Sequence, residues 1–331
     1  MYALNCIKIA TAIDPACGSG NFLTETYISL RRLENEALLA YTGGQMMLGG
    51  EGEFNPIKVG IGQFYGIEIN DFAVTVAKTA LWIAESQMMH ETEQLMQVNL
   101  DFLPLKSYAN IVEGNALRVD WESVVPKDKL NFIMGNPPFV GYKFQTKSQK
   151  DEISLIAGDF PNYGTLDYVS AWYIKSADFI KDTKIIVAFV ATNSICQGEH
   201  VTTLWKPLFS KEITIKFAYR TFIWDSEASL KAHVHCVIVG FGCNQVFKEK
   251  WIYDSDRKIL AQNISGYLLD TPSVFIDKQK KPLCSNVPIA TKGNAAMDNG
   301  NLTLNSEEYE NILQEEPYLV NLEHVDTKVK I

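Results

Sequence analysis

The chain has 331 residues, 47% of them hydrophobic and 21% charged, which is enough apolar material for one large α/β domain and a smaller lobe. Its net charge of −9 at pH 7 argues against a strong free-standing nucleic-acid binder, because phosphate contacts need lysine and arginine. No apolar run reaches the length of a membrane span and residues 1–10 lack a signal-peptide pattern, so we expect a cytoplasmic protein without a membrane partner.

The first predicted strand, residues 7–13, ends at the segment DPACGSGNF, which leads into a helix. The apolar positions of this helix recur at helical spacing, at Leu23, Tyr27, Leu30, Leu33 and Ala37. Gly18 and Gly20 let the backbone approach a ligand closely, and the free N–H groups at the start of the helix point at the same place. An isolated copy of this pattern would more often be a plain tight turn.

A second strand is predicted at residues 63–69, with Glu68 near its carboxyl end. An ionised carboxylate at that place accepts two hydrogen bonds, as the ribose hydroxyls of a nucleoside require. A third strand, residues 111–113, ends just before Asn115, whose side chain could contact the edge of an adenine ring. The sequence therefore predicts a nucleoside site at the carboxyl edge of a parallel sheet.

Two features lie between these strands. Residues 35–62 do not fit a minimal crossover, because seven glycines between positions 43 and 62 indicate an insertion after the first helix. Asp71 is predicted to cap a second helix. The apolar stripe of that helix is expected to pack on the sheet and consists of Val74, Ala77, Leu81, Ala84 and Met88.

Asn136-Pro137-Pro138-Phe139 follows a short apolar run, residues 132–134, that predicts a buried strand. Two consecutive prolines cannot donate backbone hydrogen bonds, so the carbonyls around them stay free to accept from a ligand. The Asn136 side chain adds another acceptor, and Phe139 adds a flat apolar face that suits stacking on a nucleobase. The tetrapeptide therefore predicts chemistry on a planar amine.

Helices and strands continue to alternate downstream, which predicts a mostly parallel, doubly wound sheet. Helices are expected at residues 166–180 and 199–209, and strands at 184–192, 213–220 and 233–241. The loop between the last two strands is expected to hold Phe222 and Trp224. After about residue 245 the pattern loses its regularity, and three prolines indicate a small lobe or an extended connection.

The six cysteines form no CxxC pair, so we expect reduced thiols rather than disulfides or a zinc site. His233 and His235 share one predicted strand face, but they lack nearby cysteine or carboxylate partners. We predict no metal.

Taken together, these segments resemble the S-adenosylmethionine-dependent amino-methyltransferases that act on adenine in DNA. DPACGSGNFL resembles their cofactor loop, YGIEIN their ribose-binding strand, EGNAL their adenine-binding strand and NPPF their catalytic tetrapeptide. Downstream, DYVSAWYIKSADFI, IVAFVATNSICQGEHV and FAYRTFIWDSEASLKAHVHCVIVGFG resemble the methyltransferase region of single-chain restriction-modification enzymes of the MmeI type. AAMDNGNLTLNSEEY resembles the segment that leads from this region towards a target-recognition domain. The resemblance covers most of the chain.

The resemblance implies a Rossmann-like class I methyltransferase fold, with a seven-stranded, mostly parallel sheet, helices on both faces and a final strand inserted antiparallel. The methyltransferase domain would occupy residues 1–245, including the insertion at 35–62. Residues 246–331 would form an irregular C-terminal extension leading towards a recognition domain that, like the nuclease domain, lies outside this chain. The implied cofactor is S-adenosyl-L-methionine, bound by Asp14, Ala16, Cys17, Gly18, Gly20, Asn21, Phe22, Glu68, Ile69, Asn115 and Ala116.

The implied reaction transfers a methyl group to the exocyclic amine of an adenine flipped out of double-stranded DNA, as the modification step of a restriction-modification system. The catalytic residues would be Asn136, Pro137, Pro138 and Phe139, and the substrate would contact Phe139, Phe222, Trp224 and Lys143. Phe222 and Trp224 are at least as often core residues. For the lysines at 143, 147 and 150, contact with the DNA backbone and a solvated surface loop are equally consistent.

Two departures from the family pattern stand out: Asn115 takes the place of a frequent Asp, and Phe139 takes the place of the commoner Tyr.

Other functions also remain open. The same tetrapeptide serves enzymes that methylate RNA bases or protein glutamine, although the downstream similarity argues against both. A non-catalytic cofactor-binding scaffold fragment fits as well, whereas a nicotinamide-dependent enzyme would need a GxGxxG loop. In the families that this chain resembles, a segment before the cofactor loop closes over the methionine end of the cofactor. Only thirteen residues precede Asp14 here, so we expect weak cofactor binding. We also expect no sequence-specific DNA binding by this chain alone.

Overall fold

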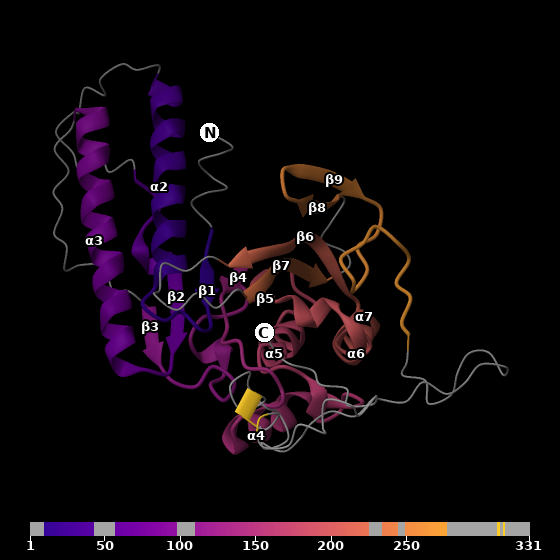
Figure 1. Ribbon diagram of the computed structural model, residues 1–331. Coiled ribbons are helices and arrows are strands. Elements are labelled where there is room, and N and C mark those ends of the chain that lie inside the picture. The colour runs from indigo at the N-terminus through magenta and orange to yellow at the C-terminus, as the bar shows by residue number, and fades with distance from the viewer. Residues whose placement is uncertain are drawn as a thin grey trace. The chain divides into compact units, whose positions relative to one another are not determined.

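The computed structural model describes residues 10–42, 57–97, 110–224, 234–243 and 249–276, together with residues 310, 311 and 314. The chain divides into two compact units, Met1–Asp277 and Lys278–Ile331, and every element below belongs to the first. The described part of this unit contains a mixed sheet of nine strands, in the order β3-β2-β1-β4-β5-β7-β6-β8-β9 (Figure 1).

The first half of the sheet is parallel. It consists of β1 (Ala12–Asp14), β2 (Phe64–Glu68), β3 (Asn110–Glu113), β4 (Phe132–Gly135) and β5 (Ile186–Thr192). The central strand β1 pairs with both β2 and β4, so Ala12 lies opposite Phe64 on one side and Phe132 on the other. Because all five strands run the same way, the loops that follow them meet at one edge of the sheet.

The second half contains the predicted antiparallel insertion. Strand β7 (Val234–Cys243) lies between β5 and β6 (Ile213–Trp224) and is antiparallel to both. The predicted number of seven strands is wrong, because β8 (Lys250–Asp254) and β9 (Arg257–Ala261) extend the sheet beyond β6. Residues expected to be irregular therefore form a hairpin, in which Ile252 is buried and Ser255 adopts a positive φ.

Phe222 and Trp224 lie inside β6 and not in the predicted loop. They pair with Cys236 and Val234 of β7. Two register shifts interrupt this pairing, and such irregularities let a long strand bend while it stays in the sheet. The strand therefore continues four residues beyond the predicted end at Arg220.

Helices α2 (Asn21–Thr42) and α3 (Asp71–Met96) pack side by side (Figure 1). The predicted stripe of α3 is buried throughout, at Val74, Ala77, Leu81, Ala84 and Met88. Its N-cap is Asn70, whose side-chain oxygen accepts the Ala73 N–H at 3.0 Å, and the predicted cap Asp71 is the first helical residue. An amide placed one residue earlier satisfies the same free backbone donor.

The helix α2 continues into the predicted insertion at 35–62, since residues 35–42 are helical, while residues 43–56 lie outside the described ranges. Leu33, expected on its apolar stripe, is 48% exposed. Arg31 and Glu34 are buried instead and form an ion pair. Arg31 also donates to Thr92 of α3 at 2.6 Å, and Glu34 accepts the backbone N–H of Lys58 at 2.6 Å. A polar network therefore joins α2 to α3 and to the segment that precedes β2.

The opposite face of the sheet carries the larger hydrophobic cluster. Ile13 of β1 belongs to this cluster and Ala12 to the cluster beneath α2 and α3, because successive strand side chains point to opposite faces. The helical segments that contribute to the larger cluster are α4 (Lys147–Ala157), α5 (Ser170–Phe179), a π-helical turn (Val201–Trp205) and α7 (Lys206–Ser210). The short helix α6 (Gly198–His200) leads into the π-helical turn.

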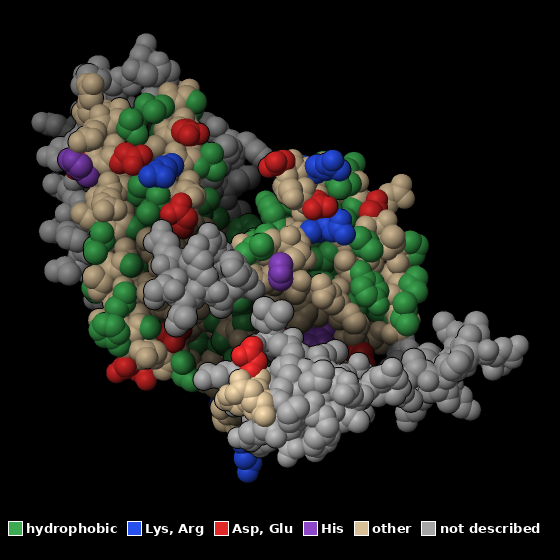
Figure 2. All heavy atoms as spheres, in the orientation of Figure 1, with side chains coloured by type: hydrophobic (Ala, Val, Ile, Leu, Met, Phe, Trp, Pro, Cys, Tyr) green, Lys and Arg blue, Asp and Glu red, His purple; other side chains and the backbone are tan. Residues whose placement is uncertain are grey.

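In the space-filling view, acidic and basic side chains are interspersed with hydrophobic ones over the described part of the visible face (Figure 2). Within the described ranges, every helix is too short or too polar to cross a membrane. A second group of lysines, at 278, 280 and 281, for which the sequence favours a solvated surface loop, lies outside the described residues.

Candidate active site

The glycine loop after β1 is held by backbone contacts and by one carboxylate. Gly20 adopts a φ of +83°, and a Cβ atom at this position would lie 2.9 Å from the Cβ of Ala77 on α3. Glycine meets both requirements because it lacks a side chain. The N–H of Gly18 donates to Oε2 of Glu68 at 2.9 Å, and the N–H of Cys17 donates to the Ile67 carbonyl at 3.2 Å. The loop after β1 is therefore tied to the end of β2.

Glu68 joins three neighbouring loops at the carboxyl edge of the sheet. Besides the bond from Gly18, its Oε1 accepts the N–H of Asn70 at 3.0 Å, and its backbone carbonyl accepts the N–H of Gly114 at 2.8 Å. Each carboxylate oxygen can accept more than one hydrogen bond, so acceptor capacity remains for a ligand. The predicted carboxylate is therefore both fixed in orientation and available.

Asp14 ends β1 and is 1% exposed. Its Oδ1 accepts the Ala16 N–H at 2.9 Å, and a Cβ atom on Gly135 of β4 would lie 2.3 Å from the same oxygen. Burial raises the pKa of this carboxyl to about 7, the Ala16 N–H opposes the rise, and the nearby Glu68 carboxylate adds to it. Asp14 is thus a packing element between the loops after β1 and β4.

This pKa makes folding depend on pH through Asp14. The folded pKa of about 7 lies above the ordinary value of 3.8, so the folded protein holds the proton more tightly between these values. The protonated Asp14 carboxyl therefore stabilises the folded state fully below about pH 4, and this contribution is lost as the pH rises through 7. It amounts to about 4 kcal/mol, at roughly 1.4 kcal/mol for each pKa unit. We expect Asp14→Asn to gain thermal stability relative to the unmodified chain between pH 4.5 and pH 7.5, as measured by unfolding midpoints. A constant difference between the two proteins would contradict this pH dependence.

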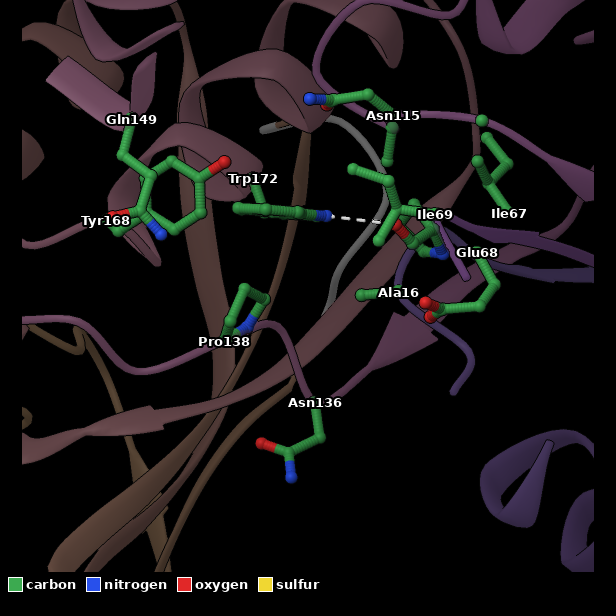
Figure 3. A pocket seen from close by; sticks show the side chains of 13 residues that line it. Ala16, Ile67, Glu68, Ile69, Asn115, Asn136, Pro138, Gln149, Tyr168 and Trp172 are labelled. Carbon is green, nitrogen blue, oxygen red and sulfur yellow. Dashed lines mark hydrogen bonds between the residues drawn. The ribbon is translucent and has the colours of Figure 1, made fainter. Parts of the chain in front are cut away.

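A cavity of about 380 Å³ opens beside these loops (Figure 3). The predicted site residues that line it are Ala16, Glu68, Ile69, Asn115, Ala116, Asn136 and Pro138. The predicted residues that do not line it are Asp14, Cys17, Gly18, Gly20, Asn21, Phe22, Pro137, Phe139, Lys143 and Phe222, and the side chain of Trp224 lies outside the described part of the chain. In this view Glu68 lies on one side of the cavity, Tyr168 on the other, and Trp172 between them.

Sequence reasoning assigned no role to Tyr168, Trp172 and Gln149, which also line the cavity. The Trp172 Nε1–H donates to the Pro15 carbonyl at 3.0 Å and so fixes its indole ring against the glycine loop (Figure 3). Tyr168 and Trp172 belong to the segment DYVSAWY. The only signal for these two residues in the sequence was the resemblance of this segment to the MmeI-type methyltransferase region. Aromatic residues at helical spacing also suit an ordinary hydrophobic core, so their spacing alone indicates no site.

The Asn-Pro-Pro-Phe loop follows β4 at the same edge of the sheet. Oδ1 of Asn136 is buried and, within the described residues, makes no hydrogen bond. An acceptor left without a donor is costly, so this atom is suited to a ligand that donates one. Pro137 is buried, and Pro138 is exposed at the cavity wall. Phe139 is partly buried and packs against the larger hydrophobic cluster.

Asp167 holds the continuation of this loop. Its Oδ1 accepts the Tyr142 N–H at 3.0 Å, and its Oδ2 accepts the hydroxyl of Ser194 at 2.5 Å. Ser194 lies just after β5. The N–H of Tyr168 donates to the Val140 carbonyl at 2.9 Å. The chain after Pro138 is therefore fastened to the loops that precede α5 and follow β5.

The remaining predicted side chains lie around this edge. Lys143 is exposed in the loop, and the lysines at 147 and 150 are exposed on α4. Phe222 is partly buried near the carboxyl end of β6. His235 is exposed on β7, and His233 lies outside the described residues. The described ranges contain no group of three or more His, Cys, Asp or Glu side chains arranged to hold a metal ion.

An antiparallel β7 between β5 and β6, a glycine loop after β1 and an Asn-Pro-Pro loop after β4 together define a Rossmann-like methyltransferase. The comparison with protein families agrees. Residues 3–254 match the family described as MmeI, DNA-methyltransferase domain, and the chain belongs to this family. The resemblance drawn from the sequence is confirmed.

Two relatives share most of this chain. DNA methyltransferase A of Bacillus subtilis strain 168 is 41% identical over 310 residues, which are 93% of this chain and 35% of that protein. The solved structure of the Type IIL restriction-modification enzyme MmeI in complex with DNA is 40% identical with a TM-score of 0.85, and the match covers 95% of this chain and 42% of that one. The chain thus spans less than half the length of either relative.

Proposed function

We propose that this chain transfers a methyl group to the exocyclic amine of adenine in double-stranded DNA, as the modification part of an MmeI-like restriction-modification enzyme. The observation that carries the proposal is the buried Asn136 Oδ1, which makes no hydrogen bond within the described residues and lies in a loop that borders the cavity. An amine with two N–H groups is the donor that this acceptor lacks.

The cavity fits S-adenosyl-L-methionine as the cofactor. Its volume of about 380 Å³ is in the range of small-molecule sites. It combines the fixed Glu68 carboxylate with apolar walls at Ile67, Ile69 and Ala116. Glu68 would hold the ribose hydroxyls, Asn115 and Ile69 the adenine ring, and the backbone at Ala16 the methionine part. When bound, the cofactor supplies a methyl group that its sulfonium has already activated.

The catalytic loop would then orient the acceptor amine. The lone pair of an adenine amine is delocalised into the ring, which makes the nitrogen a poor nucleophile. If Asn136 Oδ1 and the Pro137 carbonyl accept its two N–H groups, a pyramidal nitrogen is favoured and the lone pair turns towards the methyl group. Orientation of this kind can supply effective molarities of about 10⁵ to 10⁸ M. No general base is required to form the bond, because the nitrogen attacks through its lone pair and the methylated amine then loses its extra proton to solvent.

The adenine would have to leave the DNA double helix to reach this loop, at a cost of a few kcal/mol. Stacking of the base on an aromatic side chain, worth roughly 1–3 kcal/mol, offsets this cost. Phe139 is the proposed stacking partner, and Phe222 or Trp224 would contact the other side of the base. Lys143 would contact the DNA backbone. The solved MmeI structure contains DNA, which favours DNA over RNA or protein as the substrate. Selection of the sequence would belong to a recognition domain and cleavage to a nuclease domain.

The test is incubation with S-adenosylmethionine labelled in its methyl group and with unmethylated genomic DNA, total RNA or a protein mixture as the acceptor. We expect label in DNA, and digestion to nucleosides should place it in N6-methyldeoxyadenosine. Label in RNA, in protein glutamine or in methylcytosine would contradict the proposed substrate.

A further inference from the structure

Glu152 of α4 is a buried carboxylate at the back of the cavity wall. Its side chain is 5% exposed and accepts three hydrogen bonds. Oε1 accepts Asn115 Nδ2–H at 2.8 Å and Arg118 Nε–H at 3.2 Å, and Oε2 accepts the hydroxyl of Tyr168 at 2.5 Å. A buried carboxylate normally needs such donors, but these come from three separate segments of the chain.

Two of these donors, Asn115 and Tyr168, themselves line the cavity (Figure 3). The third, Arg118, has a side chain that is 55% exposed and therefore neutralises the carboxylate only in part. Gln149, one turn before Glu152 on the same helix, also lines the cavity. Glu152 thus joins the loop after β3, helix α4 and the segment before α5 into one wall.

Glu152 also decides how the carboxamide of Asn115 is oriented. The amide nitrogen donates to Glu152, while Oδ1 accepts the Leu117 N–H at 2.9 Å. A flipped amide would place its oxygen against the carboxylate and its nitrogen against an N–H donor, so one orientation is favoured. An Asp at this position would bring a second carboxylate within contact of Glu152, and two like charges so close cannot both ionise without a penalty.

We infer that Glu152 is a positioning residue, which holds Asn115 and Tyr168 at the cofactor cavity and makes an amide the matching side chain at position 115. This role rests on the proposed function, because it assumes that the cavity binds S-adenosylmethionine. Two carboxylates would repel each other, whereas a carboxylate paired with an amide is satisfied.

The test exchanges the amide at position 115 and the carboxylate at position 152. We expect Asn115→Asp to weaken S-adenosylmethionine binding roughly tenfold or more, because a like charge is added to a buried carboxylate. In the double variant Asn115→Asp with Glu152→Gln, the glutamine amide can donate to the new aspartate. We expect its affinity to return to within about threefold of the unmodified chain, a coupling that distinguishes a contact pair from independent sites. Calorimetric titration measures the unmodified chain, the single variants Asn115→Asp and Glu152→Gln, and the double variant.

Asp151→Asn is the matched control, because Asp151 is the neighbouring residue on α4 and is exposed. Combined with Asn115→Asp, it should give no recovery, and thermal unfolding of each variant separates loss of folding from loss of affinity. Losses that simply add in the Glu152 double variant, or equal recovery with Asp151→Asn, would overturn the role of Glu152 while leaving the proposed function intact. If the unmodified chain shows no S-adenosylmethionine binding, the proposed function falls, and this role falls with it.

Discussion

Replacing Asn136 with alanine is expected to lower the rate of methyl transfer by about 10² to 10³-fold, the loss seen when one preorganised hydrogen-bonding group is removed from an active site. Asn136 Oδ1 is buried and makes no hydrogen bond within the described residues, so it is free to accept from the substrate amine. The affinity for S-adenosylmethionine should change by no more than a few-fold, because this oxygen is assigned to the acceptor and not to the cofactor. Single-turnover rates and calorimetric titration measure the two quantities separately.

Two variants control this experiment. Asn136→Asp keeps an acceptor oxygen at the same position and should retain more activity than the alanine variant. Asn110→Ala removes an amide at the amino end of β3, the edge of the sheet opposite the catalytic loop, and should leave the rate nearly unchanged. An alanine variant at 136 that loses cofactor affinity as strongly as rate would show that Asn136 serves the cofactor.

The parallel core of the fold could be predicted because its signals are local. Each of the strands β1 to β4 is a short run that ends in glycine or an acidic residue, β5 ends at Thr192 just before Asn193, and the α3 stripe repeats at helical spacing. Gly20 and Glu68 were found for the same reason, since each follows directly from its own segment. Because parallel strands place their carboxyl ends at one edge, these local predictions sufficed to bring the site together.

What could not be predicted depends on contacts between distant segments. Strands β8 and β9 extend the sheet because β8 pairs with β6 and Ile252 becomes buried there. Nothing in residues 250–261 alone indicates pairing with β6. Arg31 and Glu34 belong to residue types that are mostly exposed in proteins, yet both are buried here and each is satisfied by partners far along the chain. Glu152 is similar, because its three donors lie 16 to 37 residues away in sequence.

Glu68 is expected to have the largest effect on cofactor binding, because its carboxylate has a structural task in addition to the proposed contact with ribose. It accepts the N–H groups of Gly18 and Asn70 and so holds the glycine loop in place before any ligand arrives. Hydrogen bonds to a charged group contribute about 1.5–3 kcal/mol each. Truncating Glu68 therefore removes a ligand contact and also releases the loop that shapes the cavity.

We expect Glu68→Ala to weaken S-adenosylmethionine binding by about 100-fold or more, which corresponds to roughly 2.7 kcal/mol. The midpoint of thermal unfolding should also fall, because the Gly18 N–H loses its acceptor. The matched control is Glu113→Ala, since Glu113 is the register partner of Glu68 on β3 but is exposed and does not line the cavity. It removes the same charge at the same edge of the sheet and should leave the affinity within about twofold, as expected for an exposed charge without a contact. Equal losses in the two variants would mean that the cofactor senses only the net negative charge of this edge, and the ribose contact assigned to Glu68 would have to be abandoned.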